Sequence, residues 1–399
     1  MSTFEVKVVK IDNIEPIEGA DAIELARIAD YRSVVRKGDY KAGDLAVYIP
    51  EASIVPEWLL KDMGLEGKLA GSHKNRVKAI KLRGSLSQGL LLKCEPSKLW
   101  DKPYPEENCV LIPSEPHEGN QGGFIAKLGD NVSENLGIKK YEPEIPTCMA
   151  GEVCNIGTEN VLKYDIENLK KYPNIFTEGE EVSVTEKLHG TFCQIGFLPN
   201  GISQRVDNSN ELFENDFEMG GVFVCSKGLG SQGLVFKNNE KNLGNLYVKT
   251  FKELTKDMSW NDRLSAVFDM DTPIYIMGEV FGKGVQDLTY GLEKPEFRVF
   301  DIYIGKPGQG RFLNPAKMRD IAKELGLQMV TELYVGPYDR AKIDNLANGK
   351  TITGNGINVL EGVVIKPVEE RRDDTIGRVF LKHINEEYLL RKGNATEFN

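Results

Sequence analysis

The segment "VTEKLHGT", residues 184–191, places Lys187 where an alternating strand pattern meets a glycine turn. Glu186 stands directly before the lysine, and Gly190 follows three residues later. A lysine that only contacts solvent needs no such surroundings, whereas a lysine that acts as a nucleophile needs a defined position and a way to lose its proton. This stretch therefore predicts a strand that ends at a chemically active lysine.

Three further strand-like segments share this composition, with charges set among apolar residues. "YIMGEVFG" contains Glu279, "LEGVVIKP" contains Glu361 and Lys366, and "VFLKHI" contains Lys382. A charge flanked by Val, Ile or Phe needs partners when it is buried. These residues could pair with one another for structural reasons alone. However, buried ion pairs contribute little to stability, so their repetition favours a functional site.

A set of lysines and carboxylates suits phosphate chemistry, because cations neutralise phosphates and carboxylates hold a metal ion. The pattern G-x-x-x-x-G-K-[ST] is missing from the sequence, which excludes a P-loop protein. There is also no G-x-G-x-x-G followed by a suitable acid, so a dinucleotide-binding fold is not indicated. What remains is a nucleophilic lysine that attacks a phosphorus atom.

Six short motifs occur in a recognisable order: "EKLHG", "SKGLG", "GEVFG", "FRVFDIY", "EGVVIKP" and "FLKHI". Their order and rough spacing resemble those of nucleotidyltransferase motifs I, Ia, III, IIIa, IV and V. The chain is thus similar to the covalent nucleotidyltransferase superfamily of ATP-dependent ligases and mRNA capping enzymes. The K-x-H-G form of motif I resembles RNA ligases, since DNA ligases and capping enzymes usually have K-x-D-G. Each motif alone is weak, but six in order across residues 187–384 are specific.

The N-terminal part, residues 1 to about 95, reads as short strands separated by glycine turns, which predicts a small barrel such as an OB-fold. "VKIDNIEPIEGADAIELARI" and "NRVKAIKLRGSLSQGLLL" resemble the N-terminal OB domain of the Deinococcus/Naegleria-type RNA ligases. Only 17 residues follow Lys382, so a C-terminal OB domain like that of DNA ligases and capping enzymes is not expected.

The expected fold class is α+β. An N-terminal OB-fold β-barrel is followed by an ATP-grasp-like adenylyltransferase domain with antiparallel sheets and flanking helices. The prolines of "KYEPEIPT" suggest an interdomain linker. The expected parts are an RNA-binding domain, a linker and a nucleotidyltransferase domain, at residues 1–140, 141–154 and 155–399. Helices are expected at residues 158–172, 240–254 and 314–326.

The resemblance implies a three-step mechanism. Lys187 attacks the α-phosphate of ATP, releases pyrophosphate and forms lysyl-AMP. AMP then passes to the 5′-phosphate of an RNA strand, and a 3′-OH displaces AMP to seal the break. Lys382 and a bound Mg²⁺ or Mn²⁺ ion are expected to favour the neutral amine of Lys187. Gly190 is expected to let the backbone approach the nucleotide closely.

Other roles follow from the same resemblance. Glu279 is expected to hold the ribose, and Phe300 to stack on the adenine. Glu361 is expected to orient the metal ion through its waters. Lys366 and Lys382 are expected to neutralise the phosphates.

Three residues near the motif cores have less defined roles. Glu186 is counted among the nucleotide-binding residues. Lys227 occupies a position where relatives often have Arg, and it is expected to contact the ribose or the 5′-phosphate without the bidentate geometry of a guanidinium. His189 is assigned to the later sealing steps, with a turn histidine that makes a local hydrogen bond as the alternative.

Motif V departs from the family pattern. RNA ligases often carry two lysines spaced K-x-K, but here Ile384 takes the second position. Either His383 or a later cation such as Lys392 compensates, or the phosphate contact is thinner.

The charge balance is acidic, with 50 Lys and Arg against 60 Asp and Glu and a formal net charge of −10. This argues against a protein that coats nucleic acid indiscriminately. Residues 73–83, "HKNRVKAIKLR", nevertheless carry five Lys and Arg and no acid. On a strand, Lys74, Arg76 and Lys78 would share one face and could bind RNA. An ordinary solvated strand face is an equally good interpretation of this segment alone.

The expected function is ATP-dependent RNA ligation at 3′-OH and 5′-phosphate ends, with duplex or templated RNA as the partner and the protein acting as a monomer. No apolar run approaches 18 residues and the N-terminus is charged, so a cytoplasmic protein without membrane contact is expected. The six cysteines lack C-x-x-C spacing, which indicates free thiols rather than a zinc site. The alternatives are a DNA ligase of the same superfamily and an RNA-binding OB protein without catalysis.

Overall fold

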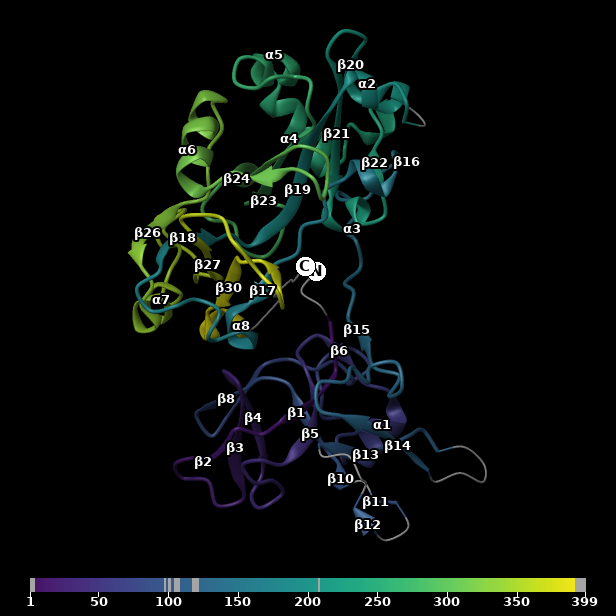
Figure 1. Ribbon diagram of the computed structural model, residues 1–399, viewed down its shortest axis with the longest axis vertical. Coiled ribbons are helices and arrows are strands. Elements are labelled where there is room, and N and C mark those ends of the chain that lie inside the picture. The colour runs from purple at the N-terminus through teal and green to yellow at the C-terminus, as the bar shows by residue number, and fades with distance from the viewer. Residues whose placement is uncertain are drawn as a thin grey trace. The chain divides into compact units, whose positions relative to one another are not determined.

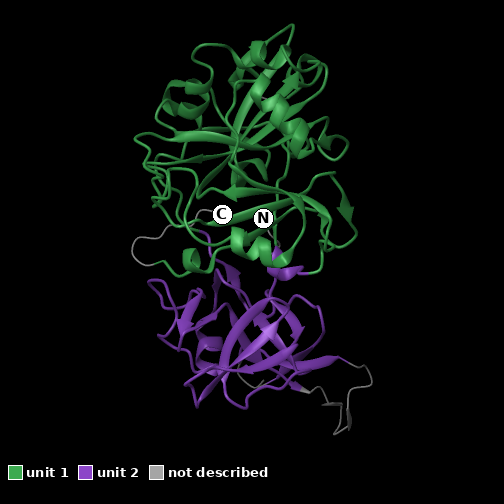
Figure 2. Ribbon diagram, turned by 90° about the vertical axis from the view of Figure 1, so that its left-hand side faces the viewer, with its two compact units in different colours: residues 1, 143–168, 174–399 green, residues 2–142, 169–173 purple. Residues whose placement is uncertain are grey.

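The computed structural model describes residues 4–96, 98–99, 102–103, 108–116, 122–206 and 209–391. These residues form two compact units (Figure 2). One unit comprises residues 143–168 and those from 174 onward, and the other comprises the chain up to 142 together with 169–173. The change of unit at residue 143 falls inside the segment 141–154 in which a linker is expected.

The N-terminal unit consists mainly of short antiparallel strands. One three-stranded sheet has the order β1 (Lys7–Lys10), β5 (Leu45–Ile49) and β9 (Leu90–Lys93), and another has β2 (Asn13–Pro16), β3 (Ile23–Ile28) and β4 (Tyr31–Arg36). Alternation along β1 and β5 buries Val8, Val47 and Ile49 against Leu59 and Leu60 of helix α1 (Glu57–Asp62). The shorter strands are β6 (Ser53–Ile54), β7 (Ile80–Leu82), β8 (Ser85–Ser87), β10 (Glu95–Pro96), β11 (Lys98–Leu99), β12 (Lys102–Pro103), β13 (Cys109–Pro113), β14 (Gly123–Lys127) and β15 (Lys139–Lys140).

The basic segment of this unit is not one continuous strand. Its regular part is limited to β7, which pairs with β8, and Lys74 before it has a φ of +55°. The carbonyl of Ser53 accepts a hydrogen bond from the amide of Val77, and Arg76 places its guanidinium 3.6 Å from the centre of the Tyr141 ring. The prediction that Lys74, Arg76 and Lys78 share one strand face is therefore wrong, because contacts with the segment around β6 replace a regular ladder.

The larger unit contains a six-stranded antiparallel sheet (Figure 1). Its order is β20 (Phe213–Asp216), β21 (Gly220–Ser226), β19 (Gly190–Pro199), β23 (Ile274–Phe281), β24 (Glu296–Ile304) and β25 (Arg311–Phe312). Three helices, α4 (Leu246–Leu254), α5 (Trp260–Ser265) and α6 (Pro315–Glu324), pack on one face. Phe251, Trp260 and Ile321 from these helices join Ile195 and Ile276 of the sheet in one apolar core.

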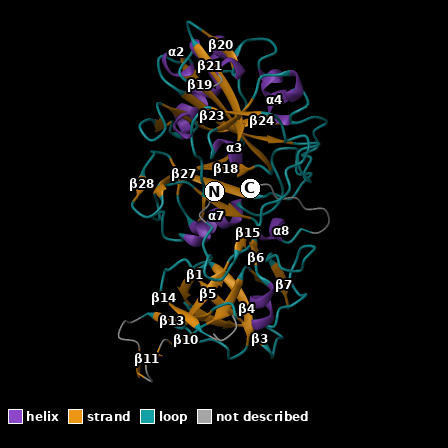
Figure 3. Ribbon diagram, turned by 90° about the vertical axis from the view of Figure 1, so that its right-hand side faces the viewer, coloured by secondary structure: helices purple, strands orange, loops and turns teal. Residues whose placement is uncertain are grey.

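A second, five-stranded sheet of this unit carries motifs I, IV and V (Figure 3). Its order is β17 (Glu167–Asn168), β30 (Leu381–Ile384), β27 (Gly362–Pro367), β18 (Glu181–Lys187) and β26 (Glu332–Pro337). The remaining elements are β16 (Val153–Asn155), β22 (Leu234–Phe236), β28 (Arg372–Asp373), β29 (Gly377–Arg378), α2 (Asn200–Ser203), α3 (Lys227–Gly230), α7 (Arg340–Leu346) and α8 (Glu386–Leu389). Within the described ranges, no helix is long and apolar enough to cross a membrane.

The prediction of a helix at residues 158–172 is wrong. This segment contains two 3₁₀ turns, Thr158–Asn160 and Leu169–Lys171, with β17 between them. Strand β17 pairs in parallel with β30, and residues 161, 162 and 164 before it are buried. Pairing and burial along an extended path outweigh the modest preference for helix that the spacing suggested.

The other two expected helices are present with altered bounds. The one expected at residues 314–326 is α6, whose first turn is capped by the Asn314 side chain, which accepts a hydrogen bond from the amide of Lys317. The one expected at residues 240–254 is divided into a 3₁₀ turn, Glu240–Asn242, and α4. Asn245 separates them, because its side chain caps the amides of Tyr247 and Val248.

Candidate active site

Lys187 and Glu361 meet where β18 ends and β27 begins. Strand pairing sets Lys187 opposite Gly362, so the preceding Glu361 lies beside the lysine. The Lys187 Nζ atom is 2.6 Å from Glu361 Oε1, and the Glu361 side chain is only 7% exposed. Gly362 has a φ of +150°, and a Cβ atom there would lie 2.2 Å from the carbonyl oxygen of His383. Only glycine therefore lets β30 pass this close to motif IV.

Carboxylates dominate the electrostatics around Lys187. Burial lowers the pKa of Lys187, but the Glu361 and Glu279 carboxylates outweigh it and raise the pKa above its ordinary value. The opposite charges of the two glutamates favour the ammonium form, and the expectation that Lys382 and a bound metal ion favour the neutral amine stays a prediction. Burial also raises the pKa of Glu279 to about 8, although Lys187 opposes this shift.

Glu361 fits the chemistry of a divalent cation site. Its second oxygen, Oε2, is buried and has no hydrogen-bond partner among the described residues. An oxygen donor of this kind suits Mg²⁺ or Mn²⁺, and Mg²⁺ commonly binds proteins through one or two carboxylates, waters and substrate phosphates. Across the part of the chain that the structure describes, no three His, Cys, Asp or Glu side chains cluster into a full metal cage. The residues present thus fit a cation that phosphate and water also coordinate.

Two further lysines lie around this pair. Lys382 of β30 is paired in register with Val364 of β27 and with Asn168 of β17. Lys227 begins α3 directly after β21, and its Nζ is 3.5 Å from Asp165. Burial lowers the pKa of Lys227, and the charge of Lys187 lowers it further. Lys187, Lys227 and Glu279 thus lie within electrostatic reach of one another.

An aromatic cluster covers the neighbouring part of the six-stranded sheet. Phe300 of β24 is half-buried, and its ring centre lies 5.3 Å from that of Tyr164 and 5.9 Å from that of Phe192. Tyr164 donates a 2.8 Å hydrogen bond to Asp301 Oδ2. This bond and the ring contacts hold the segment around Tyr164 against the sheet. This is the segment that was expected to be helical.

Lys366 belongs to a buried ionic network. Its Nζ donates a 2.6 Å hydrogen bond to the carbonyl of Phe300 and lies 3.0 Å from Asp301 Oδ2. Arg378 approaches the same carboxylate at 2.6 Å and also pairs with Glu370. The expected phosphate contact of Lys366 is therefore replaced by a contact that positions Phe300. Asp301 was overlooked in the sequence, although it stands among apolar residues in "FRVFDIY" as the other charged residues do.

His189 is held by three long-range contacts rather than a local one. Its Nε2 is 2.7 Å from Asp287 Oδ1, and its Nδ1 is 2.8 Å from the Tyr388 hydroxyl. The backbone amide of His189 donates a 2.7 Å hydrogen bond to the Tyr290 hydroxyl, and Arg391 donates to Asp287. The alternative of a turn histidine with a local hydrogen bond is wrong. No sequence motif marks these partners, because only the tertiary fold brings them to motif I.

Glu186 lies on the opposite face of β18 from Lys187, as strand alternation requires. Its Oε2 accepts hydrogen bonds of 3.0 and 2.7 Å from the amide and hydroxyl of Thr353. Glu186 was expected to bind the nucleotide, but in the structure it is a buried support for the strand. Burial raises its pKa, and Thr353 opposes this shift.

His383 does not replace the second lysine of motif V. Its Nε2 is 2.8 Å from Asp344 of α7, and it alternates with Lys382 along β30. Lys392, the other candidate for this role, lies outside the described residues.

Gly190 has a structural role in addition to the nucleotide contact expected of it, which stays a prediction. A Cβ atom on it would lie 2.2 Å from the carbonyl oxygen of Val280. This glycine is thus required by the close pairing of β19 with β23, at the start of the strand that follows motif I.

Comparison with known protein families gives one match in each of the two units. A family model described as RNA ligase matches residues 180–384, and a model described as an OB-fold domain matches residues 5–94. No curated protein matches the chain.

Solved structures of Naegleria gruberi RNA ligase are similar over almost the whole chain. The structure with PPi has a TM-score of 0.69 at 23% identity and covers 97% of this chain and 98% of its own. A mutant with ATP and Mn has a TM-score of 0.69 at 22% identity, covering 96% and 97%. A mutant with AMP and Mn has a TM-score of 0.69 at 23% identity, covering 97% and 98%.

At this identity the similarity defines the fold. The expected α+β architecture, an N-terminal OB-fold followed by a nucleotidyltransferase domain, is confirmed. The RNA ligase model covers just over half of the chain and includes motifs I to V, from Lys187 to Ile384. The chain therefore belongs to the RNA ligase family.

Proposed function

We propose that this RNA ligase uses ATP to seal breaks between a 3′-OH and a 5′-phosphate through lysyl-AMP and an adenylylated 5′ end. The observation that carries the proposal is the 2.6 Å contact between Lys187 and Glu361 beside the half-buried Glu279. Naegleria gruberi RNA ligase, which has the same fold, was solved with ATP, AMP, Mn and PPi, and these ligands support a nucleotide site of this kind.

In the first step the Lys187 amine forms a bond to the α-phosphorus of ATP, and the bond to pyrophosphate breaks. The ammonium must lose a proton to solvent beforehand, and the Glu361 carboxylate favours the charged form. Glu361 would hold a Mg²⁺ or Mn²⁺ ion, whose positive charge would neutralise phosphate oxygens and weaken the attraction between this carboxylate and Lys187.

The remaining residues bind and orient the nucleotide. We assign the adenine to Phe300, whose backbone Lys366 holds in place, and the ribose to Glu279. Lys227 and Lys382 neutralise the phosphates. Glu186 and Gly190 support the strands that carry Lys187.

His189 acts in the later sealing steps under this proposal. Because Asp287 and Tyr388 fix both of its ring nitrogens, it acts by holding the motif I turn in position.

Two assays test the function. Incubation with radiolabelled ATP distinguishes a ligase, which becomes covalently labelled, from an OB protein that only binds RNA. Ligation of nicked RNA/RNA, RNA/DNA, DNA/DNA and single-stranded substrates then separates an RNA ligase from a DNA ligase. Sealing of nicked DNA alone would overturn the assignment. Duplex or templated RNA is the proposed substrate, and the protein acts as a monomer.

The basic segment of the N-terminal unit is the proposed contact with the RNA backbone. Lys74 is exposed, Lys78 is half-buried, and Arg76 stacks on Tyr141. Replacing Lys74, Arg76 and Lys78 by Ala is expected to weaken RNA binding and to lower the salt slope by at most about three. The measurement is the affinity for nicked RNA between 50 and 200 mM salt. An unchanged salt slope would show that the segment is an ordinary solvated surface.

The six cysteines, of which four are buried, are all free thiols. Free thiols are typical of a reducing compartment, and we therefore propose a cytoplasmic location.

A further inference from the structure

The segment that connects β23 to β24 holds the turn of motif I. The Tyr290 hydroxyl accepts a 2.7 Å hydrogen bond from the amide of His189, and the Gln286 side chain donates one to the carbonyl of Gly190. From the same segment, Asp287 places its Oδ1 atom 2.7 Å from Nε2 of the His189 ring. Three side chains of one short segment therefore contact two successive residues of the turn.

Tyr290 has a strained backbone. Its φ is +54°, in the left-handed region that a bulky residue rarely adopts, and the residue is buried. The amide of Tyr290 donates a 2.7 Å hydrogen bond to the Asn358 side chain, and the Tyr290 ring meets that of Phe281 edge-on at 5.1 Å. Strained residues of this kind persist where the surrounding structure fixes them, and they cluster at active sites. The strain therefore indicates that this segment has a functional position beside motif I.

Asp287 and Arg391 form an ion pair beside the His189 ring. Arg391 Nε is 3.0 Å from Asp287 Oδ2 and Arg391 Nη2 is 3.3 Å from Oδ1, so the guanidinium contacts both oxygens. The guanidinium also lies 3.7 Å from the centre of the Tyr388 ring. The side chains of Arg391 and Asp287 are 10% and 19% exposed. The pair is thus largely removed from water, where the loss of one partner has a larger effect than on the surface.

These contacts define the orientation of the His189 ring. A carboxylate can only accept hydrogen bonds, so the contact with Asp287 places a proton on Nε2. Nδ1 lies 2.8 Å from the Tyr388 hydroxyl, which can donate to it. The ring has a partner on each nitrogen, and Arg391 contacts both partners. Arg391 therefore fixes the two groups that orient His189.

The cluster combines residues that flank three motifs. His189 belongs to motif I, Asp287 follows motif III, and Arg391 follows motif V and α8. Lys187 itself lies on β18, whose pairing with β27 sets it beside Glu361. The cluster therefore acts on the residues after Lys187 and not on the strand that carries it.

We propose that Asp287 and Arg391 are positioning residues for the sealing of RNA. They act on His189 as one ion pair, and through its ring they hold the motif I turn in the arrangement that sealing requires. The inference rests on the proposed function, because it assigns His189 to the sealing steps and takes nicked RNA as the substrate.

The test separates sealing from adenylylation. The full-length protein is given nicked RNA that already carries AMP on its 5′-phosphate, so that lysyl-AMP formation is bypassed. The variants are Asp287→Asn, Arg391→Gln and the double variant that carries both. The readouts are kcat and KM for sealing, the rate of lysyl-AMP formation with radiolabelled ATP, and the free energy of unfolding in urea.

The matched control is a second pair in which an arginine contacts both carboxylate oxygens. Arg371 donates to Glu180 at 2.6 and 2.9 Å, and the Glu180 side chain is 19% exposed, as that of Asp287 is. Glu180 directly precedes β18, so this pair lies at the opposite end of the strand from Lys187. Glu180→Gln, Arg371→Gln and their double variant should seal with the kcat of the parent protein, even where they lower the free energy of unfolding.

Asp287→Asn and Arg391→Gln are each expected to lower kcat for sealing by ~10–100-fold, because a small displacement near the reacting groups has effects of this size. KM for the nicked RNA and the rate of lysyl-AMP formation should stay close to those of the parent protein. The double variant should seal faster than either single variant, because two amides can form a hydrogen bond without an unpaired charge. Arg391→Lys, which keeps the charge, should also seal faster than Arg391→Gln.

The possible failures are distinct. If the parent protein forms no lysyl-AMP and seals no nicked RNA, the proposed function fails. If the parent does both and the variants seal with the same kcat, only this inference fails. It also fails if lysyl-AMP formation and sealing decrease together with the free energy of unfolding, since Asp287 and Arg391 would then support the whole unit. A double variant whose loss equals the product of the two single losses would show that the residues do not act as one pair.

Discussion

At the residue scale, the surroundings of Lys187 define its chemistry. Its ammonium lies 2.6 Å from Glu361 Oε1. Lys187→Ala is expected to abolish lysyl-AMP formation, because no other group there can form the phosphoramidate. Lys187→Arg should be equally inactive, since a guanidinium stays protonated. The measurement is covalent labelling by radiolabelled ATP, with Lys323→Ala as a surface control that keeps the label. Persistent labelling of Lys187→Ala would contradict the assignment.

Glu279 gives a prediction about pH. Burial raises its pKa from 4.5 to about 8, so the folded state holds this proton more tightly than the unfolded state does. The resulting stability is fully present below pH ~4.5 and is lost as the pH rises through about 8. Glu279→Gln is therefore expected to flatten the decline of the unfolding free energy between pH 5 and 8. Urea unfolding at a series of pH values measures this.

The control for this measurement is Glu178→Gln, which changes an exposed glutamate and should follow the parent protein at every pH. If Glu279→Gln and the parent protein showed the same pH dependence, Glu279 would be ionised in the folded protein.

At the scale of elements, the alternation of side chains along β18 and β30 places the candidate site residues on one face of the sheet and the residues that make structural contacts on the other. Lys187 and Lys382 lie near the site, whereas their neighbours Glu186 and His383 bind Thr353 and Asp344. A shift of one residue in either strand would exchange these roles. The pairing of β18 with β27 therefore determines which charges meet the nucleotide.

Helix α8 contributes to motif I through one hydroxyl. Tyr388→Phe removes the 2.8 Å hydrogen bond to His189 Nδ1 and leaves a buried nitrogen unpaired. It is expected to lower the unfolding free energy by ~1–3 kcal/mol. Urea denaturation measures the change. Tyr334→Phe is the matched control, because its hydroxyl bonds to the Pro337 carbonyl near solvent, and it should cost ~0.5 kcal/mol or less. Equal losses in the two variants would show that α8 does not hold motif I.

At the scale of the whole molecule, the chain enters the N-terminal unit a second time. Residues 169–173 belong to that unit, where Leu169 is fully buried and Lys170 Nζ donates a 2.8 Å hydrogen bond to Gln88. The predicted division of the sequence into consecutive domains does not include this short second passage of the chain through the N-terminal unit.

This return changes what a truncation should do. A fragment of residues 143–399 retains Lys187 and its partners, so it is expected to form lysyl-AMP but to seal nicked RNA poorly. Loss of the first unit also exposes Leu169, whose burial contributes ~1.5–3 kcal/mol, and the fragment should aggregate. Leu169→Ser in the fragment should reduce aggregation, measured by light scattering. A fragment that seals nicked RNA as the full chain does would contradict a role for the first unit.

The sequence by itself determined the family and the place of Lys187 at the end of a strand. Strand alternation and glycine turns are local properties, so the strand ending at Lys187 and the strands of the N-terminal barrel could be read directly. The order of six motifs is likewise a property of the chain, and it predicts Glu279, Glu361 and Lys382 as site residues without any knowledge of contacts.

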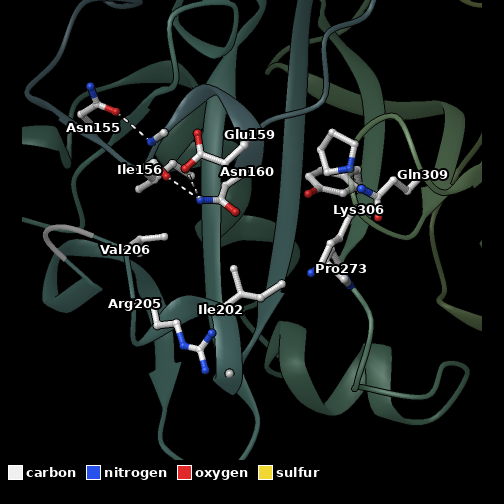
Figure 4. Close-up of a pocket in the computed structure, with 14 residues that line it drawn as sticks. Asn155, Ile156, Glu159, Asn160, Ile202, Arg205, Val206, Pro273, Lys306 and Gln309 are labelled. Atoms are coloured by element: carbon white, nitrogen blue, oxygen red, sulfur yellow. Dashed lines mark hydrogen bonds between the residues drawn. The ribbon is translucent and has the colours of Figure 1, made fainter.

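Only the tertiary structure decided which residues touch. Glu361 meets Lys187 from 174 residues away, and Tyr388 meets His189 from 199 residues away. Residues 158–172 have a helical spacing, but pairing with β30 and burial of Tyr164 make them extended. Helix propensity contributes less than 1 kcal/mol per residue for most amino acids, so sheet pairing and burial override it. A pocket around Asn160 and Ile202 arises in the same way, because four separate segments line it and none carries a signal alone (Figure 4).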